Sequence, residues 1–246
     1  MIYVRKMVIS PLGADESYEA DIPAVRQVIA EGGLPFESPV TFFVGENGSG
    51  KSTMLEAAAI AAGFNAEGGS RNMSFQTCET HSNLYKNVTL HRGAKRPRDG
   101  FFLRAESFYN VASHIDVIDE IPAASRKISE SYGGSSLHTR SHGEGFMSLA
   151  LNRFSGEGLY VLDEPEAALS PKNQIALLGR IDYLVKHSSQ FIIATHSPII
   201  MAYPGARIFV FSENGIEETE YTSTEHYFLT RRFINDYENF LKTMLD

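Results

Sequence analysis

Apolar residues along the chain gather in short runs that glycine, proline and charged residues separate. Runs rich in β-branched and aromatic residues are typical of strands that are buried on both faces. Such runs occupy residues 40–44, 101–105, 159–162 and 190–195. Looser alternation at residues 2–9 and 87–91 predicts two further strands. An Asn-Gly pair between residues 207–211 and 216–221 predicts a β-hairpin.

Helices are predicted between these strands. Residues 54–62 are rich in strong helix formers and precede Gly63. Ser170 as N-cap and Pro171 at the first helical position predict a long helix to residue 187. Further helices are predicted at residues 22–31, 107–118, 146–154, 224–230 and 234–245. Because strands alternate with helices, we expect an α/β fold with a mostly parallel sheet and ligands at the carboxyl ends of its strands.

Composition is that of a soluble globular protein. The 246 residues are 43% hydrophobic and 21% charged, so we expect one domain over residues 1–246. A net charge of −8 argues against an overall basic field that attracts nucleic acid or anionic lipid. Cys78 is the single cysteine, which excludes an intrachain disulfide. Since the sequence also has no signal peptide and no membrane-length apolar run, we expect a cytoplasmic protein without direct membrane insertion.

A phosphate-binding loop follows the strand at residues 40–44. Nine residues match G-x-x-x-x-G-K-[ST], namely Gly45, Glu46, Asn47, Gly48, Ser49, Gly50, Lys51, Ser52 and Thr53. Glycines let successive N–H groups point inward, and the start of a helix attracts anions. Lys51 is expected at the β- and γ-phosphates and Ser52 at Mg²⁺. A glycine-rich turn with a chance lysine is the disfavoured alternative, and Asn47 fits a left-handed turn as well as a pocket lining.

Two other strands also end in chemically active residues. Asp163 and Glu164 directly follow residues 159–162, and His196 follows residues 190–195. Asp163 suits a water that is bound to Mg²⁺, and Glu164 suits the orientation and deprotonation of an attacking water. His196 would contact the γ-phosphate or hold Glu164 and the water. The alternatives are a helix-capping acid, a surface acid and a structural histidine.

The segment Ser141-His142-Gly143-Glu144-Gly145 opens an apolar helix. The Ser141 hydroxyl and the N–H groups of the first turn could bind an anion, although an ordinary N-capped helix has the same pattern. Residues 92–100 form a basic loop. A solvated turn explains this loop better than a contact with nucleic acid or an acidic partner.

These motifs together resemble the ATP-binding-cassette (ABC) type of P-loop ATPase, and the whole chain resembles stand-alone bacterial predicted ATPases of the AAA/ABC-head group. Residues 45–53 match Walker A, 159–165 Walker B, 167–170 the D-loop, 195–197 the switch-histidine loop and 141–144 the signature whose core is Ser-Gly-Gly-Gln. The resemblance implies a P-loop NTPase with ABC-ATPase-like architecture: a mostly parallel central sheet, a helical lobe near residues 107–150 and an antiparallel β portion.

The resemblance also implies ATP and Mg²⁺ as ligands and a homodimer that sandwiches two ATP molecules. Ser141, Gly143 and Glu144 of one chain would then meet the γ-phosphate held by the other. His142, Glu144 and Ser170 depart from the usual glycine, glutamine and aspartate. The Q-loop position, near the metal, falls on Glu106 or on Gln76.

Three uses of a cycle of ATP binding and hydrolysis remain open. The first is a stand-alone switch ATPase, including a nucleic-acid-associated role in repair or defence. The second is the nucleotide-binding subunit of an ABC transporter, with a membrane protein as partner. A module that binds ATP without hydrolysis is disfavoured, because both Asp163 and Glu164 are present.

Overall fold

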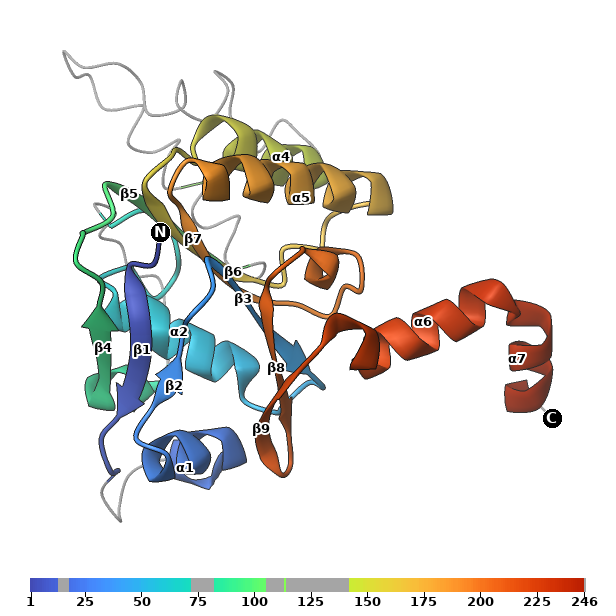
Figure 1. Cartoon of the computed structure of the whole chain (residues 1–246), viewed down its shortest axis with the longest axis horizontal. Coiled ribbons are helices and arrows are strands. Elements are labelled where there is room, and N and C mark those ends of the chain that lie inside the picture. The colour runs from blue at the N-terminus through green and yellow to red at the C-terminus, as the bar shows by residue number, and fades with distance from the viewer. Residues whose placement is uncertain (13–17, 72–81, 105–112, 114–141, 246) are drawn as a thin grey trace.

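The computed structural model describes residues 1–12, 18–71, 82–104, 113 and 142–245, and their strands form two sheets (Figure 1). The larger sheet contains β3 (Val40–Gly45), β5 (Asp99–Arg104), β6 (Gly158–Asp163), β7 (Gln190–Ala194), β8 (Arg207–Ser212) and β9 (Gly215–Thr219). Its strand order is β5-β6-β7-β3-β8-β9. The smaller sheet contains β1 (Val4–Ile9), β2 (Leu34–Pro35) and β4 (Val88–Arg92), in the order β2-β1-β4.

The larger sheet is parallel from β5 to β8, and only β9 runs antiparallel to its neighbour. Every residue of β3, β6 and β7 is buried. Continuous apolar runs, rather than alternating ones, fit strands that are covered on both faces. The predicted mostly parallel sheet is therefore confirmed, and the smaller sheet is the predicted antiparallel portion.

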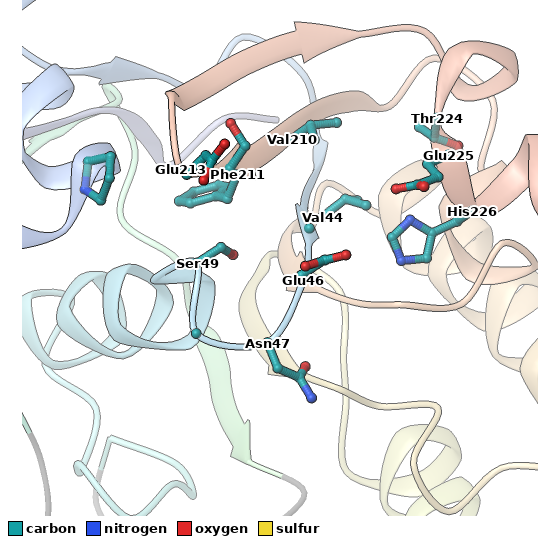
Figure 2. A pocket seen from close by; sticks show the side chains of 14 residues that line it. Val44, Glu46, Asn47, Ser49, Val210, Phe211, Glu213, Thr224, Glu225 and His226 are labelled. Atoms are coloured by element: carbon teal, nitrogen blue, oxygen red, sulfur yellow. The ribbon is translucent and has the colours of Figure 1, made fainter.

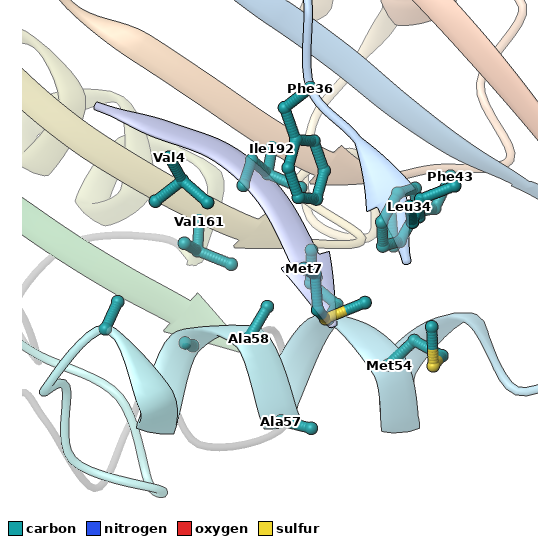
Figure 3. Close-up of a cluster of buried hydrophobic side chains, with 14 of the residues drawn as sticks. Val4, Met7, Leu34, Phe36, Phe43, Met54, Ala57, Ala58, Val161 and Ile192 are labelled. Carbon is teal, nitrogen blue, oxygen red and sulfur yellow. The ribbon is translucent and has the colours of Figure 1, made fainter. Parts of the chain in front are cut away.

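The described residues also form helices, of which all but the last two cover the central sheet. They are α1 (Pro23–Ala30), α2 (Lys51–Ala61), α4 (His142–Asn152), α5 (Pro171–Lys186), α6 (Glu225–Asn235) and α7 (Tyr237–Leu245), with short 3₁₀ helices η1 (Tyr18–Asp21), η2 (Asn83–Asn87), η5 (Ile200–Ala202) and η6 (Tyr221–Ser223). The pair α4 and α5 lies on one face of the sheet (Figure 1). On the other face, α2 packs between the two sheets, where Met7, Phe36 and Met54 meet in one apolar cluster (Figure 3).

Several predicted boundaries were wrong. Helix α2 begins at Lys51 instead of residue 54, because the last loop residues already form its first turn. Strand β5 begins at Asp99, inside the predicted loop, where it pairs with β6. Helix α6 continues to Asn235, and the two-residue strand β2 was not predicted. The predicted helix at residues 107–118 lies outside the described residues except for residue 113.

Within the described residues, no helix combines the length and the apolarity that a membrane crossing needs. Of the predicted helical lobe near residues 107–150, the described part is residue 113 and residues 142–150, which form most of α4.

Candidate functional site

Strand order brings three distant turns to one edge of the sheet. Strand β7 lies between β6 and β3, and Ala194 at its end pairs with both Asp163 and Phe43. Because these strands are parallel, their carboxyl ends face the same way. The loop after β3, the acidic turn after β6 and the histidine after β7 therefore lie side by side.

The loop after β3 has a backbone that requires glycine. Gly45, Gly48 and Gly50 have φ angles of +143°, +82° and +94°. A Cβ atom on Gly45 would lie 2.2 Å from the carbonyl oxygen of Phe211, and one on Gly50 would lie 2.6 Å from Cγ2 of Ile22. The glycines thus allow both the curled loop and its close approach to β8 and to the start of α1.

Lys51 points into this loop from the first turn of α2. Its side chain is buried, and its Nζ donates to the carbonyl oxygens of Gly45 at 2.7 Å and Glu46 at 2.6 Å. Burial lowers the pKa of the Lys51 ammonium, whereas Glu164 and Asp163 raise it. A cation is therefore held in the loop by two carbonyl groups, where a phosphate oxygen could replace them.

Ser52 and Asp163 meet beside this lysine. The Ser52 hydroxyl donates to Oδ1 of Asp163 at 3.1 Å, which joins residues that are 111 positions apart. Among the described residues, no three His, Cys, Asp or Glu side chains gather into a metal site. The hydroxyl and carboxylate are hard oxygen ligands, so this pair fits Mg²⁺, which takes its remaining ligands from waters and phosphates.

Glu164 occupies an unusual backbone conformation. Its φ of +48° is in the left-handed region, and its N–H donates to Ala194 at 2.9 Å. Such a conformation costs about 1–3 kcal/mol for a residue other than glycine, and it is common at functional sites. The turn brings Oε1 of Glu164 to 3.6 Å from Nε2 of His196, just beyond hydrogen-bond distance.

Glu166 fixes the other side of His196, and its role was not predicted from the sequence. Its Oε1 accepts a hydrogen bond of 2.5 Å from the His196 backbone N–H. Burial raises the pKa of Glu166, although this hydrogen bond opposes the shift. Its place in the same acidic turn as Glu164 was the available signal.

A cavity of about 560 Å³ adjoins the loop and extends to the start of α6 (Figure 2). Loop residues from Gly45 to Ser49, the β8–β9 hairpin, and Thr224, Glu225 and His226 line it. The imidazole of His226 lies 5.7 Å from that of His196, measured between ring centroids. No motif surrounds His226, so only the fold could reveal that it borders the site.

The surroundings of both imidazoles favour the neutral form. Burial lowers the pKa of His196, and the Lys51 ammonium lowers it further, against the opposing effect of Glu164. Burial likewise lowers the pKa of His226, assisted by His196. Nε2 of His196 is buried and has no hydrogen-bond partner, so this ring nitrogen is available to a ligand.

The predicted signature segment is described only in part. A Cβ atom on Gly143 would lie 2.5 Å from the carbonyl oxygen of Ala168, so the first turn of α4 packs against the turn that follows Glu164. The side chain of Glu144 is exposed. Ser141, Glu106 and Gln76 lie outside the described residues.

Comparisons with known families agree with this geometry. A family model described as "AAA domain" matches residues 25–150, half of the chain, and one described as "AAA domain, putative AbiEii toxin, Type IV TA system" matches residues 145–202. The fold and the matched motifs define a P-loop ATPase of the ABC/AAA type. The chain belongs to the AAA-domain family, whose members bind and hydrolyse nucleotides.

Solved structures show the same fold. MJ1267, an ATP-binding cassette of an ABC transporter, matches with a TM-score of 0.52 and 13% identity over 96% of this chain and 99% of that chain. A structure described as "An inward-facing conformation of a putative metal-chelate type ABC transporter" matches with a TM-score of 0.50 and 13% identity over 94% and 88%. No curated protein matches the chain in sequence. The resemblance to ABC-type ATPases is confirmed at the level of fold.

Proposed function

We propose that this chain binds ATP together with Mg²⁺ and hydrolyses the bond to the γ-phosphate. It acts as a homodimer in the cytoplasm. The observation that carries the proposal is the placement of β7 between β3 and β6. This placement gathers a buried lysine, an acid pair and a histidine at one phosphate-binding loop.

The loop and the start of α2 supply the binding energy for the triphosphate. Backbone N–H groups of the glycine loop and the positive end of α2 face the phosphates, and Lys51 exchanges its two carbonyl partners for phosphate oxygens. Ser52 and Asp163 hold Mg²⁺, which neutralises charge on the β- and γ-phosphates.

Hydrolysis is assigned to the side chains around Glu164. Its carboxylate orients a water molecule and accepts the proton that the water loses during attack. Neutral His196 contacts the γ-phosphate through Nε2, while Glu166 holds the backbone of His196 in place. These hydrogen bonds position the water and the γ-phosphate. Phosphoryl transfer depends on such positioning more than on covalent participation by the protein.

A second copy of the chain completes the site. The support for this assignment is the match of residues 141–144 to the ABC signature, together with the likeness in fold to an ATP-binding cassette. We assign Ser141, Gly143 and Glu144 of the second copy to the γ-phosphate side, and Glu106 to the metal side. Closure with ATP and opening after hydrolysis would then provide the motion that does work.

A second candidate is the nucleotide-binding subunit of a transporter. It is supported by MJ1267, an ATP-binding cassette of an ABC transporter, at the level of fold. A nucleic-acid-associated role in repair or defence is the third candidate. Capture of partners with an ATP-trapped dimer distinguishes them: a membrane protein supports the transporter role, and nucleic acid supports the other.

Substitution Glu164→Gln tests the proposal. We expect ATP binding to persist, hydrolysis to fall about 10²–10⁴-fold, and a dimer to accumulate with Mg·ATP, because the general base is lost while the phosphate site stays intact. ATP binding is measured by calorimetry, phosphate release by a coupled assay and mass by sedimentation.

Two further variants make this result specific. Glu217→Gln removes an exposed carboxylate from β9 and should leave the rate unchanged. Lys51→Ala removes the loop cation and gives the reference for lost ATP binding. Hydrolysis at the wild-type rate in Glu164→Gln contradicts the assigned base, and equal mass with and without ATP contradicts nucleotide-driven closure.

A further inference from the structure

Helices α6 and α7 project from the body of the molecule as an arm, residues 225–245 (Figure 1). Neither helix has a single buried residue. Large apolar side chains are nevertheless exposed along it: Phe228, Leu229, Phe233, Ile234, Tyr237, Leu241, Met244 and Leu245. Ile234 and Met244 are each 69% exposed. Large apolar side chains exposed together on one element are typical of a surface for protein association.

Packing between α6 and α7 does not bury these apolar side chains. The ring of Phe233 meets that of Phe240 at 5.7 Å, and the Arg232 guanidinium lies 5.5 Å from the centre of the Phe240 ring. These contacts hold α7 against the end of α6. Ile234 and Met244 remain outside them, on a surface that a single chain leaves in water.

The base of the arm is firmly attached to the body. Thr224 is the buried N-cap of α6, and its hydroxyl donates to the carbonyl oxygen of Tyr221 at 2.8 Å. The Tyr221 hydroxyl donates to Pro198 at 2.8 Å, two residues after His196. The arm therefore leaves the body beside the phosphate-binding loop, at the edge of the sheet where the second copy lies in the proposed dimer.

Charge on the arm identifies its partner. Three basic residues, Arg231, Arg232 and Lys242, balance three acidic ones, Glu225, Asp236 and Glu238. A surface without net charge does not suit an anionic membrane or nucleic acid, which attract basic surfaces. A second copy carries the complementary charges, because Arg231 and Arg232 lie near the end of α6 while Asp236 and Glu238 lie at the start of α7.

We propose that this arm pairs with the arm of a second copy and holds two chains together before ATP binds. This inference rests on the homodimer of the proposed function and adds an interface that does not depend on nucleotide. Apolar side chains supply the attraction, and the mixed charges set the antiparallel register. The two nucleotide sites are thus already paired when ATP arrives.

The full-length double variant Ile234→Glu/Met244→Glu tests the arm in the absence of nucleotide. We expect sedimentation to show a dimer for the wild type at about 10 μM and a monomer for the variant, with the dimer dissociation constant raised at least tenfold, because each paired interface acquires buried carboxylates. The matched control is Asn235→Glu/Thr243→Glu, which adds the same charge at the neighbouring exposed positions. It should remain a dimer.

Each result supports or overturns the arm separately from the hydrolysis mechanism. Calorimetry checks that the double variant still binds ATP and is folded. A monomeric wild type without nucleotide overturns the arm interface, even where Mg·ATP then produces a dimer of Glu164→Gln. A double variant that stays dimeric also overturns it. A monomer that binds anionic vesicles shows that the arm is a membrane-binding element instead.

Discussion

At the scale of single residues, the site places the Lys51 ammonium next to imidazole rings whose neutral form is favoured. Lys51 stays within reach of the carboxylates of Asp163 and Glu164, whereas burial lowers the pKa of the nearby imidazoles of His196 and His226. A protonated imidazole here would add a second cation next to Lys51. Protonation of either ring should therefore weaken the folded site.

This reasoning predicts a pH dependence of stability. A histidine whose pKa is lowered by folding takes up its proton more readily in the unfolded chain, so stability falls as pH drops below about 6.5. Replacement His226→Asn should flatten the decrease in unfolding free energy between about pH 7.5 and 5.5. Urea titrations at several pH values measure it. His91→Asn, at an exposed position on β4, is the control, and equal slopes in His226→Asn and wild type contradict the assignment.

Residues next to strand ends were predictable, and their supporting partners were not. Lys51, Asp163, Glu164 and His196 each follow a recognisable apolar run, so their convergence was foreseen from the parallel sheet. Glu166 was not singled out from the sequence, and His226 lies in a helix with no motif. The roles of Glu166 and His226 depend on contacts between segments that are distant in the sequence, and the local sequence pattern does not reveal these contacts.

At the scale of elements, a polar network fastens β5, β6 and α4 at the end of the sheet opposite the site. The buried Tyr160 hydroxyl donates to Asp99 at 2.8 Å and accepts from the Ser155 N–H at 2.7 Å, and Arg153 pairs with Asp99 at 2.7 Å. Burial and the Asp99 carboxylate raise the pKa of Tyr160, so its proton stays in place.

Removal of this hydroxyl in Tyr160→Phe should lower the unfolding free energy by about 1–2 kcal/mol, because the Ser155 N–H and Asp99 lose a partner. ATP hydrolysis should not change, since Tyr160 precedes Asp163 by three residues, roughly 10 Å along the strand. Denaturant unfolding and phosphate release measure the two effects. Tyr183→Phe, at a half-exposed ring, should cost almost nothing; an equal loss in both variants would show that the network is not the cause.

Elements that begin or end at clear capping or turn residues were predicted well. Ser170 and Pro171 open α5 where the pattern placed it, and the Asn-Gly turn joins β8 to β9. Elements without such residues at their ends were predicted poorly. Strand β2 forms because it pairs with the edge of β1, and the start of β5 at Asp99 depends on pairing with Gly158. Tertiary pairing overrides local preference in both cases.

At the scale of the whole molecule, Gln190 joins the two sheets. Its side chain is fully buried at the start of β7, and Oε1 accepts from the N–H groups of Tyr3 at 2.7 Å and Val4 at 2.9 Å. Its Nε2 donates to the carbonyl oxygen of Val4 at 2.9 Å. One amide thus anchors the first strand of the chain to the central sheet.

Replacement Gln190→Met keeps the length of the side chain but leaves these backbone groups unpaired. We expect the unfolding free energy to fall by about 2–4 kcal/mol, measured by urea titration, because buried unsatisfied amides are costly. A loss below about 0.5 kcal/mol would show that the sheets are held by apolar packing alone.

The central place of β7 also has a consequence for synthesis. A growing chain makes β3 and β6 before residues 190–194, and until then both strands present an open, apolar edge where β7 belongs. Such edges invite pairing with other nascent chains. Insertion of β7 closes both edges at once, so the newborn protein should gain nucleotide affinity and resistance to aggregation in the same step.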